Sequence, residues 1–460
     1  MGKPLKDYND IMAACRTRLV TNTTTAKFGD KTFEFFPLTT IRQVASAGSV
    51  SGIFHFSGLD TDTVYELKNR IRSGGERLFA LAIYCGLSPP DVLFVLTTHN
   101  DDALPFSPKD WLGVTEEQSD SVYSTICDAQ HLFTVPELQE SQYRTDLTGH
   151  AIPIEFNRGV NPDVGEGSGG KVYKARIHNS CASFLRESQG AHDWSRYLAL
   201  KVSKFREDAE RECDFLETLA RSPGSHEHIT TFYTGFVFEK KVYLIAELAD
   251  GNLDDFMAKH PERRAVKDLD REWLLAQLRG LASALEVLHG QMTYHHHDIK
   301  PANILVFNDP AANVKHRLKF TDFGSAGFAG CIDATGRSAK SKIKGNTPTL
   351  PPETYKNGSS SRPHDVWSLG CVFLDILVWY WKGWEYLKEF RSEVEEESVA
   401  WCYYTVEDGN VTRTEAVSAA LDELGPTEAE LVCVIQDMLG IDPGCRPNAA
   451  SVWERLGPID

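Results

Sequence analysis

One short stretch of the chain, from Tyr294 to Val306, gathers residues that could perform chemistry together. Its sequence, Y-H-H-H-D-I-K-P-A-N-I-L-V, places Asp298, Lys300 and Asn303 close to one another and ends in an apolar run. A carboxylate can accept the proton of a substrate hydroxyl, and an amide oxygen in the same loop can hold Mg²⁺ beside phosphate groups. Phosphoryl transfer is a reaction that needs a carboxylate and an amide at such a spacing.

The stretch resembles the catalytic loop of eukaryotic protein kinases, whose pattern is H-R-D-x-K-x-x-N before an apolar strand. The resemblance implies that Asp298 is the catalytic base, that Lys300 steadies the transferred phosphoryl group, and that Asn303 is a metal ligand. A lysine at this place is typical of serine/threonine kinases. His297 replaces the family's arginine, so activation through a phosphate bound by that arginine is less expected. A histidine metal cluster is the weaker alternative, because the family spacing already accounts for His296 and Asp298.

A glycine-rich segment and a lysine upstream are similar to the family's nucleotide site. Gly165 to Val172 fits G-x-G-x-x-G-x-V, in which glycines let the backbone approach the phosphates of ATP. That motif alone is weak evidence, but a strand ending in Lys201 follows it. The resemblance implies that Lys201 grips the phosphates and pairs with Glu212, with Glu210 as the runner-up. It also assigns these residues to the nucleotide: Gly165, Gly167, Gly170, Val172, Ala199, Lys201, Ala246, Glu247, Ala249 and Leu305. The small Ala246 side chain predicts an open pocket behind the adenine.

Three further motifs follow the catalytic loop in the order that the family shows. Asp322-Phe-Gly324 matches D-F-G, which implies that Asp322 is the second metal ligand. The activation segment is expected between Asp322 and Glu353, with Asn346 in place of the usual threonine. By resemblance, Asp365 ties down the catalytic loop and Arg446 forms a salt bridge with Glu353.

The motifs run in family order over most of the second part of the chain. The predicted fold is α+β, a bilobal kinase-like fold with a β-rich small lobe at about 151–248 and a helical large lobe at about 252–456. The kinase domain as a whole is expected at 151–460. Residues 391–425 have no assignment, and the turn residues His226 and His228 are expected on the surface.

Residues 1–150 carry none of these motifs and predict a mainly helical domain followed by a linker. Apolar spacing predicts helices over 61–71 and 76–84, and either a helix or a strand over 91–96. The first fifty residues, with the apolar cluster 33–38, are either short strands or poorly ordered. Two pieces, 78–86 and 101–106, are similar to uncharacterised fungal signalling proteins. The region either docks a partner or regulator, or braces the kinase.

Composition narrows the class of protein. There are 48 basic and 65 acidic residues, for a net charge of −17. This charge argues against nucleic acid or an anionic membrane as the main partner. Ten cysteines without paired C-x-x-C spacing indicate free thiols in a reducing compartment. The start has no apolar signal core, and the longest apolar run, 371–381, is too short to span a bilayer. A cytoplasmic protein is expected, with the nucleus as the alternative.

These observations predict a protein serine/threonine kinase that uses ATP and Mg²⁺ and acts on a protein substrate. The alternative from another class is a pseudokinase, a nucleotide-binding scaffold, for which His297 and Asn346 are the only support. A kinase of small molecules is the second alternative, and the Glu353 and Arg446 motifs favour a protein substrate over it. The sequence specifies neither the substrate nor the pathway nor the oligomeric state.

Overall fold

The computed structural model divides the chain into two compact units. It describes residues 8–55, 59–107, 116–156, 165–167, 170–188, 193–203, 206–222, 226–263, 266, 268–308, 315–325, 327–328, 348–357, 362–398 and 401–457. Unit 1 comprises Met1–Asp163, Tyr173–Leu200 and Thr234–Tyr243. Unit 2 comprises Val164–Val172, Lys201–Tyr233 and Leu244–Asp460. The N-terminal region thus shares unit 1 with segments that were predicted to belong to the small kinase lobe. The expected boundary at residue 150, between the N-terminal domain and the kinase domain, stays a prediction.

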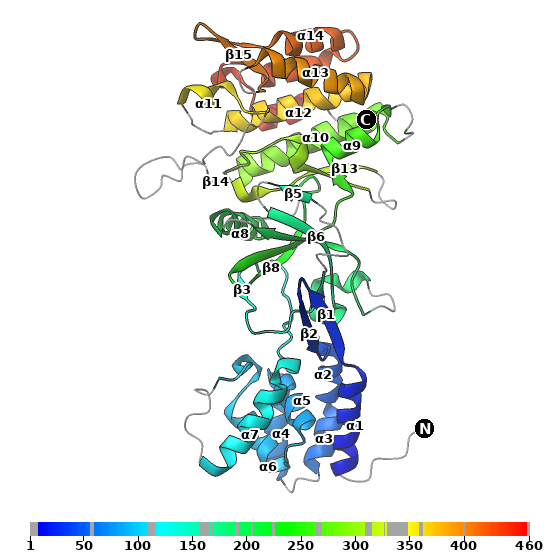
Figure 1. Ribbon diagram of the computed structural model, residues 1–460, viewed down its shortest axis with the longest axis vertical. Coiled ribbons are helices and arrows are strands. Elements are labelled where there is room, and N and C mark those ends of the chain that lie inside the picture. The colour runs from blue at the N-terminus through cyan, green and yellow to red at the C-terminus, as the bar shows by residue number, and fades with distance from the viewer. Residues whose placement is uncertain are drawn as a thin grey trace. The chain divides into compact units, whose positions relative to one another are not determined.

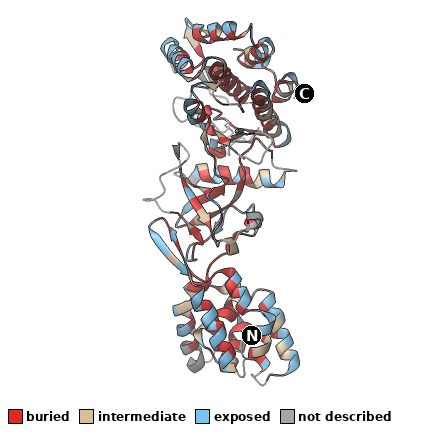
Figure 2. Ribbon diagram, turned by 90° about the vertical axis from the view of Figure 1, so that its right-hand side faces the viewer, coloured by how far each residue is buried: buried red, intermediate tan, exposed pale blue. Residues whose placement is uncertain are grey.

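Unit 1 begins with a bundle of helices around a common apolar core (Figure 1). The helices are α1 (Tyr8–Thr21), α2 (Leu38–Val44), α3 (Ala47–His55), α4 (Thr61–Arg72), α5 (Glu76–Cys85), α6 (Pro89–Thr98) and α7 (Glu116–Ala129). In Figure 2 these helices turn buried residues toward one another and exposed residues outward, as amphipathic helices do. Short 3-10 turns occur at Asp101–Ala103, Gln130–Phe133, Asn179–Cys181 and Ser183–Ser188.

The predicted helices of this region are present, and the unpredicted helices α1, α2 and α3 precede them. Helix α4 starts at an Asp60 cap, whose side chain accepts hydrogen bonds from the backbone N–H groups of Asp62 and Thr63. Helix α5 ends at Gly86, which has the left-handed φ of 71° that favours glycine. Residues 91–96 form a helix rather than a strand. The prediction for the first fifty residues was incomplete, because α1 precedes the hairpin of β1 (Thr24–Phe28) and β2 (Lys31–Phe35), and α2 and α3 follow it.

A seven-stranded sheet carries the glycine-rich segment and Lys201. Its strand order is β3-β8-β9-β7-β6-β4, and β5 also pairs with β6. The strands are β3 (Thr145–Asp146), β4 (Ile154–Glu155), β5 (Gly165–Gly167), β6 (Gly170–Ile177), β7 (Leu198–Ser203), β8 (Phe232–Phe238) and β9 (Lys241–Ala246). Helix α8 (Arg206–Arg221) follows β7, and apolar residues at helical spacing bury its inner face.

The β1–β2 hairpin packs against strands of this sheet within unit 1. Phe28 is buried, and its ring lies 4.8 Å from Phe156, 5.6 Å from Phe238 and 5.1 Å from Tyr243, measured between centroids. The backbone N–H of Phe156 donates to the carbonyl of Lys27 at 2.8 Å. The N-terminal hairpin and the sheet therefore share one apolar core.

The rest of unit 2 is mainly helical. Together with the sheet and the N-terminal bundle, these helices confirm the predicted α+β fold class with a β-rich part, a helical part and a mainly helical N-terminal region. Its helices are α9 (Leu253–Lys259), α10 (Arg271–Glu286), α11 (Pro352–Asn357), α12 (Arg362–Lys382), α13 (Trp384–Glu397), α14 (Glu415–Leu424), α15 (Ala429–Met438) and α16 (Ala449–Arg455), with a π-helical turn at Val287–Gln291. Helix α12 is buried along most of its length and forms the centre of this part. Residues 391–425, left unassigned by sequence, contain the end of α13, a hairpin and α14.

Short strands in unit 2 hold the loops that carry the site. They are β10 (Gly251–Asn252), β11 (Tyr294–His295), β12 (Ile304–Phe307), β13 (Arg317–Phe320), β14 (Gly327–Phe328), β15 (Tyr404–Glu407) and β16 (Asn410–Arg413). Antiparallel pairing of β12 with β13 brings Asn303, just before β12, beside the residues that follow β13. The backbone N–H of Thr321 donates to the carbonyl of Asn303 at 3.1 Å.

Within the described ranges, no helix is both long enough and apolar enough to cross a membrane. Nine cysteines fall in those ranges, and each is a free thiol.

Candidate active site

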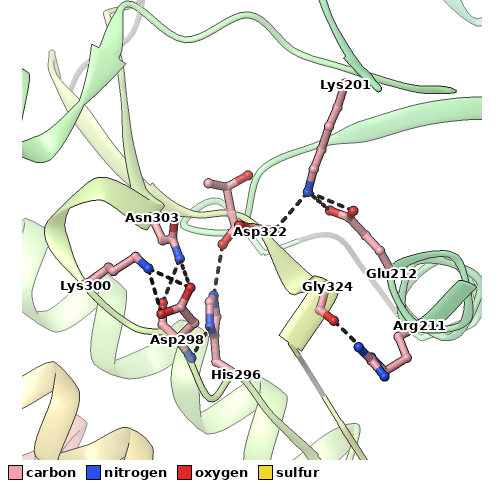
Figure 3. Close-up of polar contacts among 10 residues, drawn as sticks. Lys201, Arg211, Glu212, His296, Asp298, Lys300, Asn303, Asp322 and Gly324 are labelled. Carbon is pink, nitrogen blue, oxygen red and sulfur yellow. Dashed lines mark hydrogen bonds and ion pairs between the residues drawn. The ribbon is translucent and has the colours of Figure 1, made fainter. Parts of the chain in front are cut away.

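Lys201 and Glu212 form a buried ion pair between a strand and a helix (Figure 3). The ammonium of Lys201, on β7, lies 2.7 and 2.8 Å from the two carboxylate oxygens of Glu212, on α8. Their side chains are 13% and 1% exposed. The runner-up, Glu210, lies on the exposed side of the same helix. The ion pair that the sequence predicted is therefore present, and the glutamate that forms it is Glu212, which was preferred over Glu210.

Asp322 completes a three-membered cluster. One of its carboxylate oxygens lies 2.9 Å from the Lys201 ammonium. Its backbone has a φ of 62°, a conformation that costs energy for a residue with a side chain and that often occurs at functional sites. The next residue, Phe323, stacks on Phe215 of α8 at 4.0 Å, and Arg211 donates to the carbonyl of Gly324 at 3.1 Å. The helix that carries Glu212 is thus packed directly against the Asp322-Phe-Gly324 turn.

Burial and charge act in opposite directions within this cluster. Burial lowers the pKa of the Lys201 ammonium, but the carboxylates of Asp322 and Glu212 outweigh it and raise the pKa overall. Burial raises the pKa of Glu212 against the pull of Lys201. Burial also acts to raise the pKa of Asp322, yet Lys201 lowers it on balance. The ammonium stays charged, and Asp322 is the carboxylate that remains most readily ionised.

Asp298 is held by the other two residues of its loop. The Lys300 ammonium lies 2.9 Å from each of its carboxylate oxygens. The side-chain amide of Asn303 donates to the carbonyl of Asp298 at 2.9 Å and to its carboxylate at 2.8 Å. His296 connects this group to the first cluster, because its Nε2 lies 3.0 Å from the carbonyl of Thr321, the residue before Asp322. Figure 3 shows the two groups on either side of Asp322.

Asp365, a fully buried residue of α12, anchors the backbone of the loop that carries Asp298. Its carboxylate accepts hydrogen bonds at 2.8 Å from the backbone N–H groups of His296 and His297, and His289 contacts it at 2.8 Å. Burial acts to raise the pKa of Asp365, but the hydrogen bond and charge of His289 lower it well below its usual range. His297 has a φ of 66°, so this anchor holds a strained loop in place.

Three buried histidines near the anchor, His295, His297 and His364, have lowered pKa values because burial disfavours their charged form. The ring of His297 stacks at 5.3 Å on His295 and at 6.0 Å on His364. Burial lowers the pKa of both His295 and His297 to about 4. Among the residues that the structure describes, no group of three or more histidines, cysteines, aspartates and glutamates could hold a metal ion.

Asn303 and Asp322 fit a magnesium site by the chemistry of their free atoms. The Asn303 amide nitrogen is bonded to Asp298, which leaves its oxygen as the remaining donor atom. Asp322 uses one carboxylate oxygen for Lys201, and no described residue bonds the other. Mg²⁺ prefers such carboxylate and amide oxygens, supplemented by substrate phosphates. The two predicted metal ligands therefore present suitable oxygens.

The residues assigned to the nucleotide lie on several strands. Gly165 and Gly167 pair with Val172 and Gly170 in the β5–β6 hairpin. Gly170 has a φ of 151°, and a Cβ there would lie 2.3 Å from the carbonyl oxygen of Val202, so only glycine fits. Residues 168–169 lie outside the described residues. Ala199 lies on β7, in unit 1.

The segment after β9 is held by side-chain contacts that the sequence did not predict. Ala246 is buried at the end of β9, and Glu247 and Ala249 follow it. The carboxylate of Glu247 lies 2.7 Å from the ammonium of Lys319 and accepts from the backbone N–H of Thr231 at 2.6 Å. Leu305, on β12, pairs with Asn252 of β10. The Glu247 carboxylate is therefore occupied, and the Glu247 backbone N–H also donates to the carbonyl of Thr231 at 3.0 Å.

The predicted salt bridge between Glu353 and Arg446 is present. Two guanidinium nitrogens of Arg446 lie 2.8 Å from the two carboxylate oxygens of Glu353, and the Arg446 side chain is fully buried. Most of the expected activation segment, including Asn346, lies outside the described residues. The pairing fixes the end of that segment against the helical part of unit 2.

Comparisons with known proteins agree with this geometry. The family model for the protein kinase domain matches residues 159–455. The chain is 28% identical over 228 residues to an Aurora kinase of Schizosaccharomyces pombe, which covers 49% of this chain and 56% of that protein. It is 24% identical over 309 residues to a probable L-type lectin-domain containing receptor kinase of Arabidopsis thaliana, covering 65% and 43%. It is 23% identical over 260 residues to the serine/threonine-protein kinase Nek10 of Homo sapiens, covering 56% and 21%. The chain thus spans about half or less of the length of these relatives.

Proposed function

Because the chain belongs to the protein kinase family, we propose that it transfers the γ-phosphoryl group of ATP to a serine or threonine hydroxyl of a protein substrate. The observation that carries the proposal is the complete set of contacts around Asp322. Lys201 pairs with Glu212 and Asp322 on one side, and Asp298, Lys300 and Asn303 contact one another on the other side. An inactive scaffold has no need to keep every one of these charged groups in mutual contact.

Asp298 would orient the substrate hydroxyl and accept its proton. Its carboxylate is 15% exposed, so a hydroxyl can reach it, and Lys300 and Asn303 fix its direction. Such positioned general bases contribute typically about 10²–10⁴-fold to a rate. Lys300, next to the same carboxylate, would stabilise the negative charge on the transferring group, as preorganised cations do in kinases.

Lys201 would hold the phosphates of ATP. Its ammonium nitrogen lies 2.7–2.9 Å from carboxylate oxygens of Glu212 and Asp322, and these contacts fix the charge at one position. The glycine-rich hairpin would bring backbone N–H groups to the phosphates, and the backbone of Glu247 and Ala249 would bind adenine. The remaining nucleotide contacts are proposed for Val172, Ala199, Ala246 and Leu305.

Asn303 and Asp322 would hold Mg²⁺, which when bound neutralises phosphate charge and aligns the terminal phosphoryl group. The chain's own contribution is to direct the Asn303 and Asp322 oxygens by hydrogen bonds to Asp298 and Lys201. The lysine two residues after the base supports Ser/Thr rather than Tyr as acceptor. Nucleotide binding without transfer, as in a scaffold, is the alternative that the experiment must separate.

The N-terminal region would brace the kinase, and we propose that it also offers a surface to a partner. The shared core around Phe28 supports the bracing role. The candidate surface includes the segments 78–86 and 101–106, which contain most of α5 and a 3-10 turn and are joined by hydrogen bonds from the backbone N–H groups of Arg77 and Leu78 to Asp101.

The test is to incubate the purified chain with labelled ATP, Mg²⁺ and a generic basic protein, beside the Asp298→Asn variant. We expect label on Ser or Thr from the native protein and a loss of about 10²–10⁴-fold in the variant. ATP should still raise the unfolding temperature of both proteins. Transfer that survives Asp298→Asn would refute the role of Asp298, and ATP binding without any transfer would establish the scaffold instead.

A further inference from the structure

A cavity of about 210 Å³ lies in unit 2, away from the residues assigned to phosphoryl transfer. The loop between α8 and β8 lines it with residues 226–228, α10 lines it with Gln277 and Arg279, and β13 lines it with Arg317. Trp453 of α16 also contributes to the wall. None of the described residues that line the cavity is among those assigned to ATP, Mg²⁺ or the acceptor hydroxyl. A ligand of this cavity would therefore be distinct from the phosphoryl group that is transferred.

Arg279 supplies the cavity with a cation that has no counter-ion among the described residues. Its Nη1 is buried, and no described residue accepts a hydrogen bond from it. The guanidinium carbon lies 5.3 Å from the centroid of the Trp453 ring, and this cation–π contact helps to hold the group in place. A guanidinium presents its N–H donors as a rigid planar fork that matches the oxygens of a carboxylate or a phosphate. Arg279 is thus prepared to bind an anion.

A second unpaired donor lies two residues away on the same helix. Gln277 is fully buried, and its side-chain oxygen accepts a hydrogen bond from the backbone N–H of Leu318 at 2.9 Å. This hydrogen bond fixes which end of the amide is the oxygen. The amide nitrogen is buried, and no described residue accepts a hydrogen bond from it. Buried donors are rarely left without a partner, so the Gln277 amide is available to a ligand oxygen.

The charged groups of the cavity sum to a positive charge. Arg317 lies 3.1 Å from Glu227, whose side chain is 60% exposed, so this ion pair is partly in solvent and weak. Burial lowers the pKa of His226, and it lowers the pKa of His228 to about 3. Two arginines against one glutamate leave one net positive charge, in a chain whose net charge is −17. The cavity therefore attracts anions although the chain as a whole repels them.

We propose that this cavity binds a phosphate group, either as the free ion or as a monoester. Arg279, Arg317 and the Gln277 amide donate hydrogen bonds to its oxygens. Three donor groups suit the three or more oxygens of a phosphate better than the two oxygens of a carboxylate. The site goes beyond the proposed kinase activity and does not depend on it, because the described lining residues have no part in phosphoryl transfer.

The test is a calorimetric titration of the purified full chain with inorganic phosphate at low ionic strength. Arg279→Met removes the guanidinium but keeps an apolar side chain beside Trp453, and it should weaken binding about tenfold or more. Arg317→Met should weaken binding as well, in a side chain that is 28% exposed and therefore unlike a core position. Glu227→Gln removes the carboxylate that competes for Arg317, and it should tighten binding about threefold.

The control is Arg455→Met on α16, which removes one positive charge outside the described cavity wall. Arg455 forms an ion pair with Asp437 at 2.8 Å, and both side chains are at least partly exposed. This variant should keep the native affinity for phosphate. Phosphate that bound near Lys201 instead would be unaffected by Arg279→Met, so the comparison of variants locates the site. O-phosphoserine, titrated in parallel, binds if the cavity accepts a monoester and does not bind if it accepts only the free ion.

Two results would overturn the proposal. The first is a folded native chain that binds no phosphate, or binds it equally well after Arg279→Met and Arg317→Met. The second is acetate binding as tightly as phosphate, which would show a general anion site without selectivity for a phosphate group. Neither result bears on phosphoryl transfer, which the Asp298→Asn comparison tests separately.

Discussion

Glu212 fixes the position of the Lys201 ammonium from a buried helix face, which makes it the most informative single residue to change. Glu212→Gln keeps the volume but removes the charge that opposes Lys201. Asp322 still holds the ammonium, so we expect a loss of about 1–3 kcal/mol in the free energy of unfolding, not complete unfolding. Phosphoryl transfer should fall more steeply than stability, because Lys201 would move from its place at the phosphates.

The control for this prediction is Glu210→Gln, on the same helix two residues away. Glu210 is exposed, and its replacement should change stability by no more than about 0.5 kcal/mol. Thermal unfolding and initial rates of transfer measure the two effects. Equal losses of activity in both variants would show that the pair with Lys201 has no special role.

Histidine residues around Asp365 make the stability of the molecule depend on pH. His295 and His297 have pKa values of about 4 in the folded chain, against an ordinary value of 6.5. As the pH falls, these histidines therefore take up protons in the unfolded chain before they do so in the folded chain. The neutral histidines thus stabilise the folded chain fully above pH 6.5, and this stabilisation is lost progressively down to about pH 4. The other charged or titratable groups near these rings are Asp365, Arg362, His289, His296 and His364.

The corresponding variant is His297→Asn, followed by thermal unfolding across that pH range. It removes one of the groups that must be protonated on unfolding, so the unfolding temperature should decline less steeply toward acid than in the native chain. The slope, and not the absolute temperature, is the readout, because the substitution also alters packing. An unchanged slope would mean that His297 keeps an ordinary pKa in the folded chain.

At the residue scale, the sequence predicted the partners of side chains that belong to a motif with fixed spacing. It did not predict burial that depends on a contact with residues far away in the chain. Glu212 and Glu210 are two positions apart on a helix, which places them on different faces, so only one can reach Lys201. His228 was expected on the surface and is buried instead, which is a correction. Its Nδ1 lies 2.7 Å from the carbonyl of Leu318, and its ring lies over Gly280. Neither partner is near it in sequence, so no local pattern indicates the contact.

At the scale of elements, that contact sets the packing of α10. A Cβ at Gly280 would lie 2.0 Å from Nε2 of His228. Alanine favours a helix over glycine by about 1 kcal/mol, whereas overpacking costs typically about 1–3 kcal/mol. Because the His228 ring is held by Leu318, we expect Gly280→Ala to destabilise the chain on balance. Combining it with His228→Ala should recover part of the loss.

Gly48→Ala, in α3, is the matched control. It meets no atom within 4 Å and lies on an exposed position, so only the helix preference applies. We expect it to raise the unfolding temperature slightly while Gly280→Ala lowers it. Chemical denaturation of the three proteins would measure both signs, and a stabilising Gly280→Ala would contradict the packing argument.

Elements with clear apolar spacing or caps, such as α4 and α5, could be predicted with nearly correct ends. Helix α1 could not, although Ile11, Met12, Cys15 and Leu19 form its buried face. Polar residues lie between these four apolar residues, and a threonine-rich segment follows them. Both features conceal the helical spacing of the apolar residues in the sequence. The hairpin of β15 and β16 turns at Asp408 and Gly409, which both have positive φ. An Asp-Gly pair between two strand-like runs is a hairpin signal in the sequence itself, and the prediction did not use it. Local patterns thus specify elements, and tertiary packing decides the ambiguous ones.

At the scale of the whole molecule, the order of motifs was enough to predict the family but not the way that the N-terminal region is attached. The sequence left docking and bracing equally open. Within unit 1, Phe28 contacts Phe156, Phe238 and Tyr243, and Lys31 pairs with Glu239. These contacts join segments that are far apart in sequence, so no motif within either segment carries them.

This shared core predicts that the kinase part depends on the N-terminal region for stability. Phe28→Ala removes a buried ring and should cost about 3–5 kcal/mol in the free energy of unfolding. Tyr65→Ala, at a position 68% exposed on α4, should cost almost nothing. Removing residues 1–150 would expose Phe156 and Phe238, and we expect an unstable, aggregating protein instead of a more active one. A stable truncated chain with raised activity, measured by gel filtration and transfer assay, would show instead that the region inhibits the kinase and does not brace it.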